Sequence, residues 1–255
     1  MVFDQQPDDG TSHLSLLPEH GTDEFDDGTF EQAIREARRR ELAELEQLGL
    51  TDDTIVIFTS DNGSRAQGEG GSNGPLRAFK GTTWEGGQRV PCIVKWPGRI
   101  APGTVSGALT CAIDLHPTLI EWCGVDRGER IIDGHDLSDV LLAPDTAPDT
   151  EASGSASGGD AVSSSETVTG GLNSPHEAIW FYSGNTLEAV RAGRWKLHVS
   201  RSGAAICELY DLLDDVGETL DVAANEPDVV ARLQGLADAA RVELGDDQLG
   251  IIGAG

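Results

Sequence analysis

The sequence predicts an α/β domain followed by a small α+β subdomain with an antiparallel sheet, and three observations support this prediction. Residues 29–48 repeat apolar side chains at helical spacing among Glu and Arg, and Gly49 follows the last of them. Residues 54–59 form an apolar, β-branched run without polar alternation, which is typical of a strand buried on both faces. Beyond residue 175, short strand patterns and one long helical pattern occur together.

The elements between these landmarks follow from local composition. Residues 1–28 are rich in Asp, Gly and Pro without a sustained period, so we expect a loop. Residues 60–88 contain eight glycines and few apolar side chains. Such a stretch is too long for an ordinary connection and favours a functional loop. Residues 90–96 read as a second strand, and Asp114 is placed to cap a helix that ends at Gly124.

The C-terminal part is separated from these elements by a stretch of different composition. Residues 143–175 are mostly Ser, Gly, Thr, Asp and Glu without a Lys or Arg, so we expect a disordered acidic insertion. The predicted parts of the chain are therefore 1–142, 143–175 and 176–255. Within the last part, strands are expected at 177–182, 187–191, 195–200 and 207–210, and a helix at 226–244.

The charge of the chain excludes two classes of partner. The sequence has 44 acidic and 18 basic residues and a formal net charge of −26 at pH 7, which argues against nucleic acid and anionic membranes. Only three of the basic residues are lysines, namely Lys80, Lys95 and Lys196. An acidic, Lys-poor composition is typical of halophiles, where concentrated salt screens the excess charge. Since this sequence shows no signal peptide, the expected location is the cytoplasm, unless an export signal lies upstream.

Two oxygen-bearing side chains directly follow the strand predicted at 54–59. Asp61 and Asn62 are adjacent, and adjacent side chains can share a ligand only just beyond the end of a strand. Ligands bind at the carboxyl ends of strands in open α/β sheets, and carboxylate and amide oxygens suit calcium. The sequence Asp-Asn-Gly is above all a turn sequence. The residues alone therefore favour an ordinary turn over a calcium site.

The wider context of these residues resembles the sulfatase family. The resemblance is carried by residues 54–63, 79–91, 96–98, 114–119, 133–137, 191–196 and 208–212. The second of these segments contains Lys80-Gly81-Thr82-Thr83-Trp84-Glu85-Gly86-Gly87. The resemblance implies that residues 1–142 are the C-terminal portion of a sulfatase catalytic domain, with a mixed sheet flanked by helices, and that residues 176–255 are its C-terminal subdomain. It also implies a sulfuric ester hydrolase, arylsulfatase-like, that acts on a sulfate ester with bound calcium.

The resemblance assigns roles to individual residues. Asp61 and Asn62 would ligate the calcium ion that holds the sulfate group. Lys80 would contact the sulfate, for which a compact ammonium is suited, although a solvated surface lysine is the alternative. His13 lies in a segment that loosely resembles the family's His-Thr-Pro-Leu sequence, so it would protonate the leaving alcohol. An exposed loop histidine is the alternative there.

Two further residues have a structural interpretation. Glu85 and Arg89 flank the Gly86-Gly87 pair, so we expect them to pair and brace the loop.

The family's nucleophile is a formylglycine made from Cys or Ser in the motif Cys/Ser-x-Pro-x-Arg, which is absent from this sequence. The cysteines, Cys92, Cys111, Cys123 and Cys207, are spaced unlike zinc or redox pairs and are expected in the core. We therefore expect this chain alone to hydrolyse no sulfate ester. One alternative is a non-catalytic remnant, or a half that binds a separately encoded N-terminal half. Another is a related metal-dependent phosphodiesterase or phosphonate hydrolase.

Overall fold

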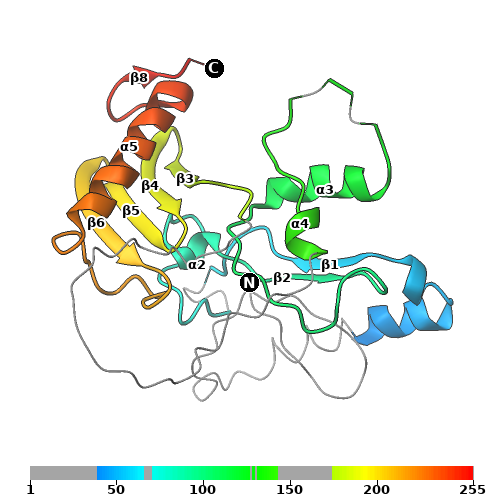
Figure 1. Ribbon diagram of the computed structural model, residues 1–255. Helices are drawn as coiled ribbons and strands as arrows, with labels where there is room; N and C mark the ends of the chain where they lie inside the picture. Colours follow the sequence, from blue (N-terminus) through cyan, green and yellow to red (C-terminus); the bar gives the residue numbers. More distant parts are fainter. Residues whose placement is uncertain (1–38, 66–70, 127, 130, 143–173, 255) are drawn as a thin grey trace, which may run out of the picture.

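The computed structural model describes residues 39–65, 71–126, 128–129, 131–142 and 174–254 (Figure 1). The loop expected at 1–28, the first part of the helix expected at 29–48 and nearly all of the insertion expected at 143–175 lie outside these residues. The domain boundaries drawn from the sequence therefore stay a prediction.

The N-terminal part of the described chain contains two strands and several short helices. Residues 39–47 are helical, and Gly49 follows with a positive φ of 66°. The remaining elements are a 3-10 helix (Thr51–Asp53), β1 (Val56–Thr59), α2 (Glu85–Gln88), β2 (Cys92–Lys95), a second 3-10 helix (Ala112–Asp114), α3 (Leu115–Trp122) and α4 (Ser138–Leu141). β1 pairs with β2 in antiparallel register, with Val56 opposite Lys95.

β1 is less buried than its sequence predicts. Its first three residues are half-buried and Thr59 is exposed, whereas the apolar run indicated burial on both faces. The physical reason is that β1 and β2 form a sheet of only two strands among the described residues. Apolar side chains of β2, of the segment that follows β2 and of the segment around α4 pack together at this sheet. They form a cluster of Val94, Ile100, Ala108, Leu137, Val140 and Leu141.

Two expectations about individual residues are wrong. Asp114 does precede α3, but its carboxylate does not cap that helix. It accepts hydrogen bonds from the backbone N–H of Cys111 at 2.6 Å and of His135 at 2.9 Å, which fixes the chain before the helix. The cysteines are not fully buried: Cys92 is half-buried and packs against the cluster around Val94, Cys111 is half-buried, and the other two, expected in the core, are exposed.

The C-terminal part is a four-stranded antiparallel sheet covered on one face by a long helix. The strands are β3 (Ile179–Ser183), β4 (Thr186–Ala192), β5 (Trp195–Arg201) and β6 (Ala204–Asp211), in the order β3-β4-β5-β6. The helix α5 (Pro227–Leu244) lies across the sheet, and β7 (Gly245–Asp246) and β8 (Ile251–Ile252) follow it (Figure 1). The predicted α/β class with an antiparallel C-terminal sheet is therefore confirmed.

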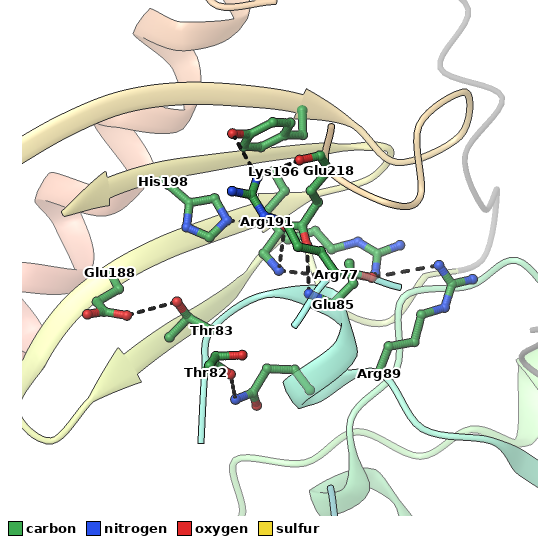
Figure 2. Close-up of polar contacts among 12 residues, drawn as sticks. Arg77, Thr82, Thr83, Glu85, Arg89, Glu188, Arg191, Lys196, His198 and Glu218 are labelled. Carbon is green, nitrogen blue, oxygen red and sulfur yellow. Dashed lines mark hydrogen bonds and ion pairs between the residues drawn. The ribbon is translucent and has the colours of Figure 1, made fainter. Parts of the chain in front are cut away.

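The two faces of this sheet differ because side chains alternate along β5. Leu197 and Val199 belong to the apolar core that also contains Val229 and Leu233 of α5. Lys196 and His198 point to the opposite face, where α2 lies (Figure 2). The fold thus places a charged sheet face against the loop that carries the Gly-rich sequence.

Among the described residues, no helix is long and apolar enough to cross a membrane.

Candidate functional site

The candidate site begins where β1 ends. The structure places Asp61, which is exposed, and Asn62, which is half-buried, just beyond Thr59. Ser60 donates a hydrogen bond from its hydroxyl to the backbone oxygen of Asn62 at 3.0 Å. Desolvation raises the pKa of Asp61, but hydrogen bonds from Asn62 and the positive charge of Lys80 outweigh it and hold the pKa below its ordinary value. Asp61 is therefore ionised at neutral pH and open to a cation.

Three glycines bring this turn against α2. The backbone N–H of Gly63 donates to the carbonyl oxygen of Gly87 at 3.1 Å, and a Cβ on Gly63 would overlap the carbonyl oxygen of Gly86. Gly86 in turn donates to the carbonyl oxygen of Arg77 at 2.8 Å. Glycine is required at these positions because three backbone segments touch. The Gly-rich sequence therefore fixes the distance between the end of β1 and the loop that carries Lys80.

Lys80 is held beside this turn through its backbone. Its side chain is exposed, and its N–H donates to the carbonyl oxygen of Ser64 at 3.0 Å. Asn73 links the same segments, since its amide oxygen accepts from the N–H of Ser64 at 2.7 Å. Its amide nitrogen donates to the carbonyl oxygens of Ser64 at 2.8 Å and Ala78 at 3.1 Å. The structure thus brings Asp61, Asn62 and Lys80 together.

Asn73 was missed by sequence reasoning. It stands before Gly74 and Pro75, so it reads as part of a local turn. Its actual partners are Ser64, nine residues away, and Ala78, five residues away. A signal did exist in principle, because an Asn side chain can satisfy one backbone donor and two backbone acceptors at once.

The residues at the end of β1 fit part of a calcium shell. Calcium takes about six to eight oxygen ligands, and Asp61 and Asn62 offer a carboxylate and an amide oxygen on one turn. In the described part of the chain, no three His, Cys, Asp or Glu side chains are grouped so that they could hold a metal ion. The donor set is therefore chemically suitable and incomplete, and the substrate, water or other protein segments would supply the remaining oxygens.

Glu85, at the start of α2, lies in a buried cluster of charges (Figure 2). Its side chain is 1% exposed. One carboxylate oxygen is 3.0 Å from Nζ of Lys196, and the other is 3.1 Å from an Nη of Arg191 and 3.7 Å from an Nη of Arg89. Burial alone would raise the pKa of Glu85, but Lys196, Arg191 and Arg89 lower it to about 2. The expected Glu85–Arg89 pair is confirmed as the longest of three ion pairs.

His13, the candidate proton donor, lies outside the described residues, so its assignment stays a prediction. Two other histidines, His198 and His176, lie beside carboxylates. His198 is buried, and its Nε2 is 3.1 Å from the carboxylate of Glu218. Burial outweighs this partner and lowers the pKa of His198, so the imidazole is neutral at pH 7. His176 has its Nε2 at 2.8 Å from the buried carboxylate of Asp114. Both serve the fold.

Comparisons with known proteins find similarity to sulfatases. Residues 39–125 match the family model for sulfatases. The chain is 46% identical to the steryl-sulfatase of Mus musculus over 110 residues, which are 40% of this chain and 18% of that protein. It is 34% identical to arylsulfatase A of Homo sapiens over 220 residues, which are 74% of this chain and 38% of that protein.

The fold has similar solved structures as well. One is the PsFucS1 sulfatase from Pseudoalteromonas sp., with a TM-score of 0.62 and 23% sequence identity. The match covers 81% of this chain and 40% of that one. The chain thus spans well under half of the length of these relatives.

Proposed function

The chain belongs to the sulfatase family, and on this premise we propose that it supplies the calcium- and sulfate-binding part of a sulfuric ester hydrolase. Asp61 and Asn62 are the proposed calcium ligands, and Lys80 is the proposed sulfate contact. The observation that supports this best is the hydrogen bond from the Lys80 N–H to Ser64 at 3.0 Å, which keeps the lysine beside the turn of Asp61. The effect of Lys80 on the pKa of Asp61 reflects the same proximity.

The chemistry of the site follows from the charges. Calcium, when bound, would act as a Lewis acid on the sulfate oxygens. Asp61 offers an ionised carboxylate at neutral pH, because its pKa is lowered. Lys80 offers an exposed ammonium that can approach a further sulfate oxygen. These two residues therefore bind and orient the ester, whereas neither is placed to attack sulfur.

The proposed nucleophile belongs to a portion of the enzyme that this sequence does not contain. We infer that this portion, whether it is continuous with the chain or a separate polypeptide, covers the half-buried β1–β2 sheet. A small apolar pocket, with a volume of about 50 Å³, opens on this sheet and is lined by Thr59, Cys92, Val94, Leu115 and Leu137, among others. Thr59, which lines this pocket, lies two residues before Asp61, so a portion docked there would lie next to the proposed calcium ligands.

Calcium binding by the purified chain tests the first part of this proposal. In concentrated KCl with excess Mg²⁺, which competes for non-specific acidic sites, we expect one saturable Ca²⁺ site by equilibrium dialysis. Asp61→Asn should abolish it. Asp53→Asn, at an exposed aspartate of the 3-10 helix that precedes β1, removes the same charge and should leave the Ca²⁺ site intact. Equal binding by both variants, or none by the parent chain, would contradict the assignment.

Activity tests the second part. The chain would be combined with an N-terminal sulfatase portion that carries Cys/Ser-x-Pro-x-Arg, and an aryl sulfate, an aryl phosphate diester and an aryl phosphonate monoester would be compared. We expect sulfate ester hydrolysis that Lys80→Met weakens and that Arg232→Met, at an exposed position of α5, does not. Preference for the phosphorus esters would favour the phosphodiesterase or phosphonate hydrolase alternative. No hydrolysis of any ester by a stable complex would favour the non-catalytic remnant.

A further inference from the structure

We propose that Glu85 is a positioning residue that holds Lys80 in front of Asp61 by anchoring the Lys80 loop to the C-terminal sheet. The Lys80 loop is defined here as residues 77–88. The inference rests on the proposed function of Lys80 and extends it. It gives the C-terminal sheet a role in the site.

Glu85 is held by both its side chain and its backbone. Its carboxylate is paired with Lys196 of β5 and Arg191 of β4 at 3.0 and 3.1 Å. Its backbone N–H donates to the carboxylate of Glu218 at 2.7 Å, and Glu218 also lies 3.1 Å from Nζ of Lys196 (Figure 2). The start of α2 is therefore fixed to the sheet in direction as well as in distance, because charge-assisted hydrogen bonds are directional.

The Lys80 loop is anchored on both sides of Lys80. Before it, Arg77 donates from Nη1 to the backbone oxygen of Glu218 at 2.6 Å, and its guanidinium lies 3.6 Å from the centre of the Trp84 ring. After it, the hydroxyl of Thr83 donates to the carboxylate of Glu188 on β4 at 2.8 Å. Lys80 itself is exposed. It lies on a short arc with one end tied to Glu218 in the loop after β6 and the other end tied to Glu188 of β4.

The helix α2 also contacts the turn that carries the proposed calcium ligands. Gly87 accepts a hydrogen bond from Gly63, and Gly86 contacts Gly63 so closely that a Cβ could not fit. α2 therefore touches the Asp61 turn through its glycines and the C-terminal sheet through Glu85. A change in the placement of α2 must alter the relation between Lys80 and Asp61.

The substitution Glu85→Gln isolates this effect. It keeps the shape of the side chain and leaves the backbone bond to Glu218 possible. It removes the charge that faces Lys196 and Arg191, whose side chains are 0% and 19% exposed. Lys196 would then keep only Glu218 of its two carboxylate partners, and a buried cation that loses part of its compensating charge is unfavourable, so the cluster must rearrange or admit water. We expect α2 and the Lys80 loop to shift as a result.

The test uses the chain itself, without calcium, in concentrated KCl. Reductive methylation with ¹³C-formaldehyde labels accessible lysines, and the sequence offers only Lys80, Lys95 and the buried Lys196. The Lys80 signal is identified by its loss in Lys80→Arg. The readout is the change in this signal on Asp61→Asn, which reports how close the two side chains are. The control is Asp246→Asn, which also removes a buried carboxylate. Asp246 pairs with Arg241 at a distance of 2.9 Å, and this pair is outside the Lys80 loop.

We expect the Asp61→Asn effect on the Lys80 signal to fall to less than half in the Glu85→Gln background and to persist in the Asp246→Asn background. A full effect in Glu85→Gln, or an equal loss in both backgrounds, would overturn the inference. If Glu85→Gln does not melt cooperatively, Arg77→Met releases the other end of the loop and should give the same loss. Because calcium is omitted, a failed calcium-binding experiment would refute the proposed function without affecting this readout.

Discussion

Acid unfolding should depend strongly on Glu85. Its pKa is about 2 in the folded chain, whereas the ordinary value is 4.5. Since one pKa unit corresponds to about 1.4 kcal/mol, the ionised form contributes roughly 3 kcal/mol of pH-dependent stability. A lowered folded-state pKa means that this contribution is fully present above pH 4.5 and is lost as the pH falls towards 2. The Glu85→Gln variant has no such group to titrate.

The assay is urea denaturation of the parent chain and Glu85→Gln between pH 6 and pH 3 in concentrated KCl. We expect a difference in the free energy of unfolding that is largest at pH 6 and shrinks steadily below pH 4.5. Other carboxyl groups titrate in both proteins and cancel in the comparison. The exposed Asp53→Asn variant should stay within about 0.5 kcal/mol of the parent chain. A difference that is constant with pH, or that grows on acidification, would refute the reasoning.

Two further variants test neighbouring features by urea denaturation. Lys196→Met leaves the buried carboxylates of Glu85 and Glu218 without their shared ammonium and should lower the free energy of unfolding by roughly 3 to 5 kcal/mol. The control Lys95→Met should have little effect. A loss below about 1 kcal/mol in Lys196→Met would contradict the buried-pair argument. Gly63→Ala places a Cβ against Gly86, so it should lower the free energy of unfolding by about 1 to 3 kcal/mol and weaken Ca²⁺ binding. The control is Gly107→Ala, whose Cβ meets open space. Equal behaviour of the two alanine variants would refute the close approach of Gly63 to Gly86.

Local pattern was sufficient to predict most of the secondary structure. The strands expected at 187–191 and 195–200 are β4 and β5, extended by one or two residues, because alternation of apolar and polar side chains specifies a half-buried strand. The helix expected at 226–244 is α5, with Pro227 at its first turn. The degree of burial of β1 could not be predicted from its own residues, since it depends on which other strands are present.

The site was predictable only where sequence neighbours form it. Asp61 and Asn62 follow a strand end, so their placement could be inferred from one segment. The residues that hold Lys80 in place come from distant positions. Glu218 binds the N–H of Glu85 across 133 residues, and Lys196 reaches the carboxylate of Glu85 across 111 residues. No spacing rule connects such pairs, because their proximity is produced by the packing of a sheet against a loop.

The alternation along β5 explains why that packing has one solution. Leu197 and Val199 face α5, where apolar contacts are tolerant of small shifts. Lys196 and His198 face the Lys80 loop, and a strand with this composition would ordinarily present them to water. Because both are at most 1% exposed, their charges and hydrogen bonds must be matched by Glu85 and Glu218. A loop shifted by one residue would leave at least one buried charge unpaired, so the polar face selects a single position for the loop and thereby for Lys80.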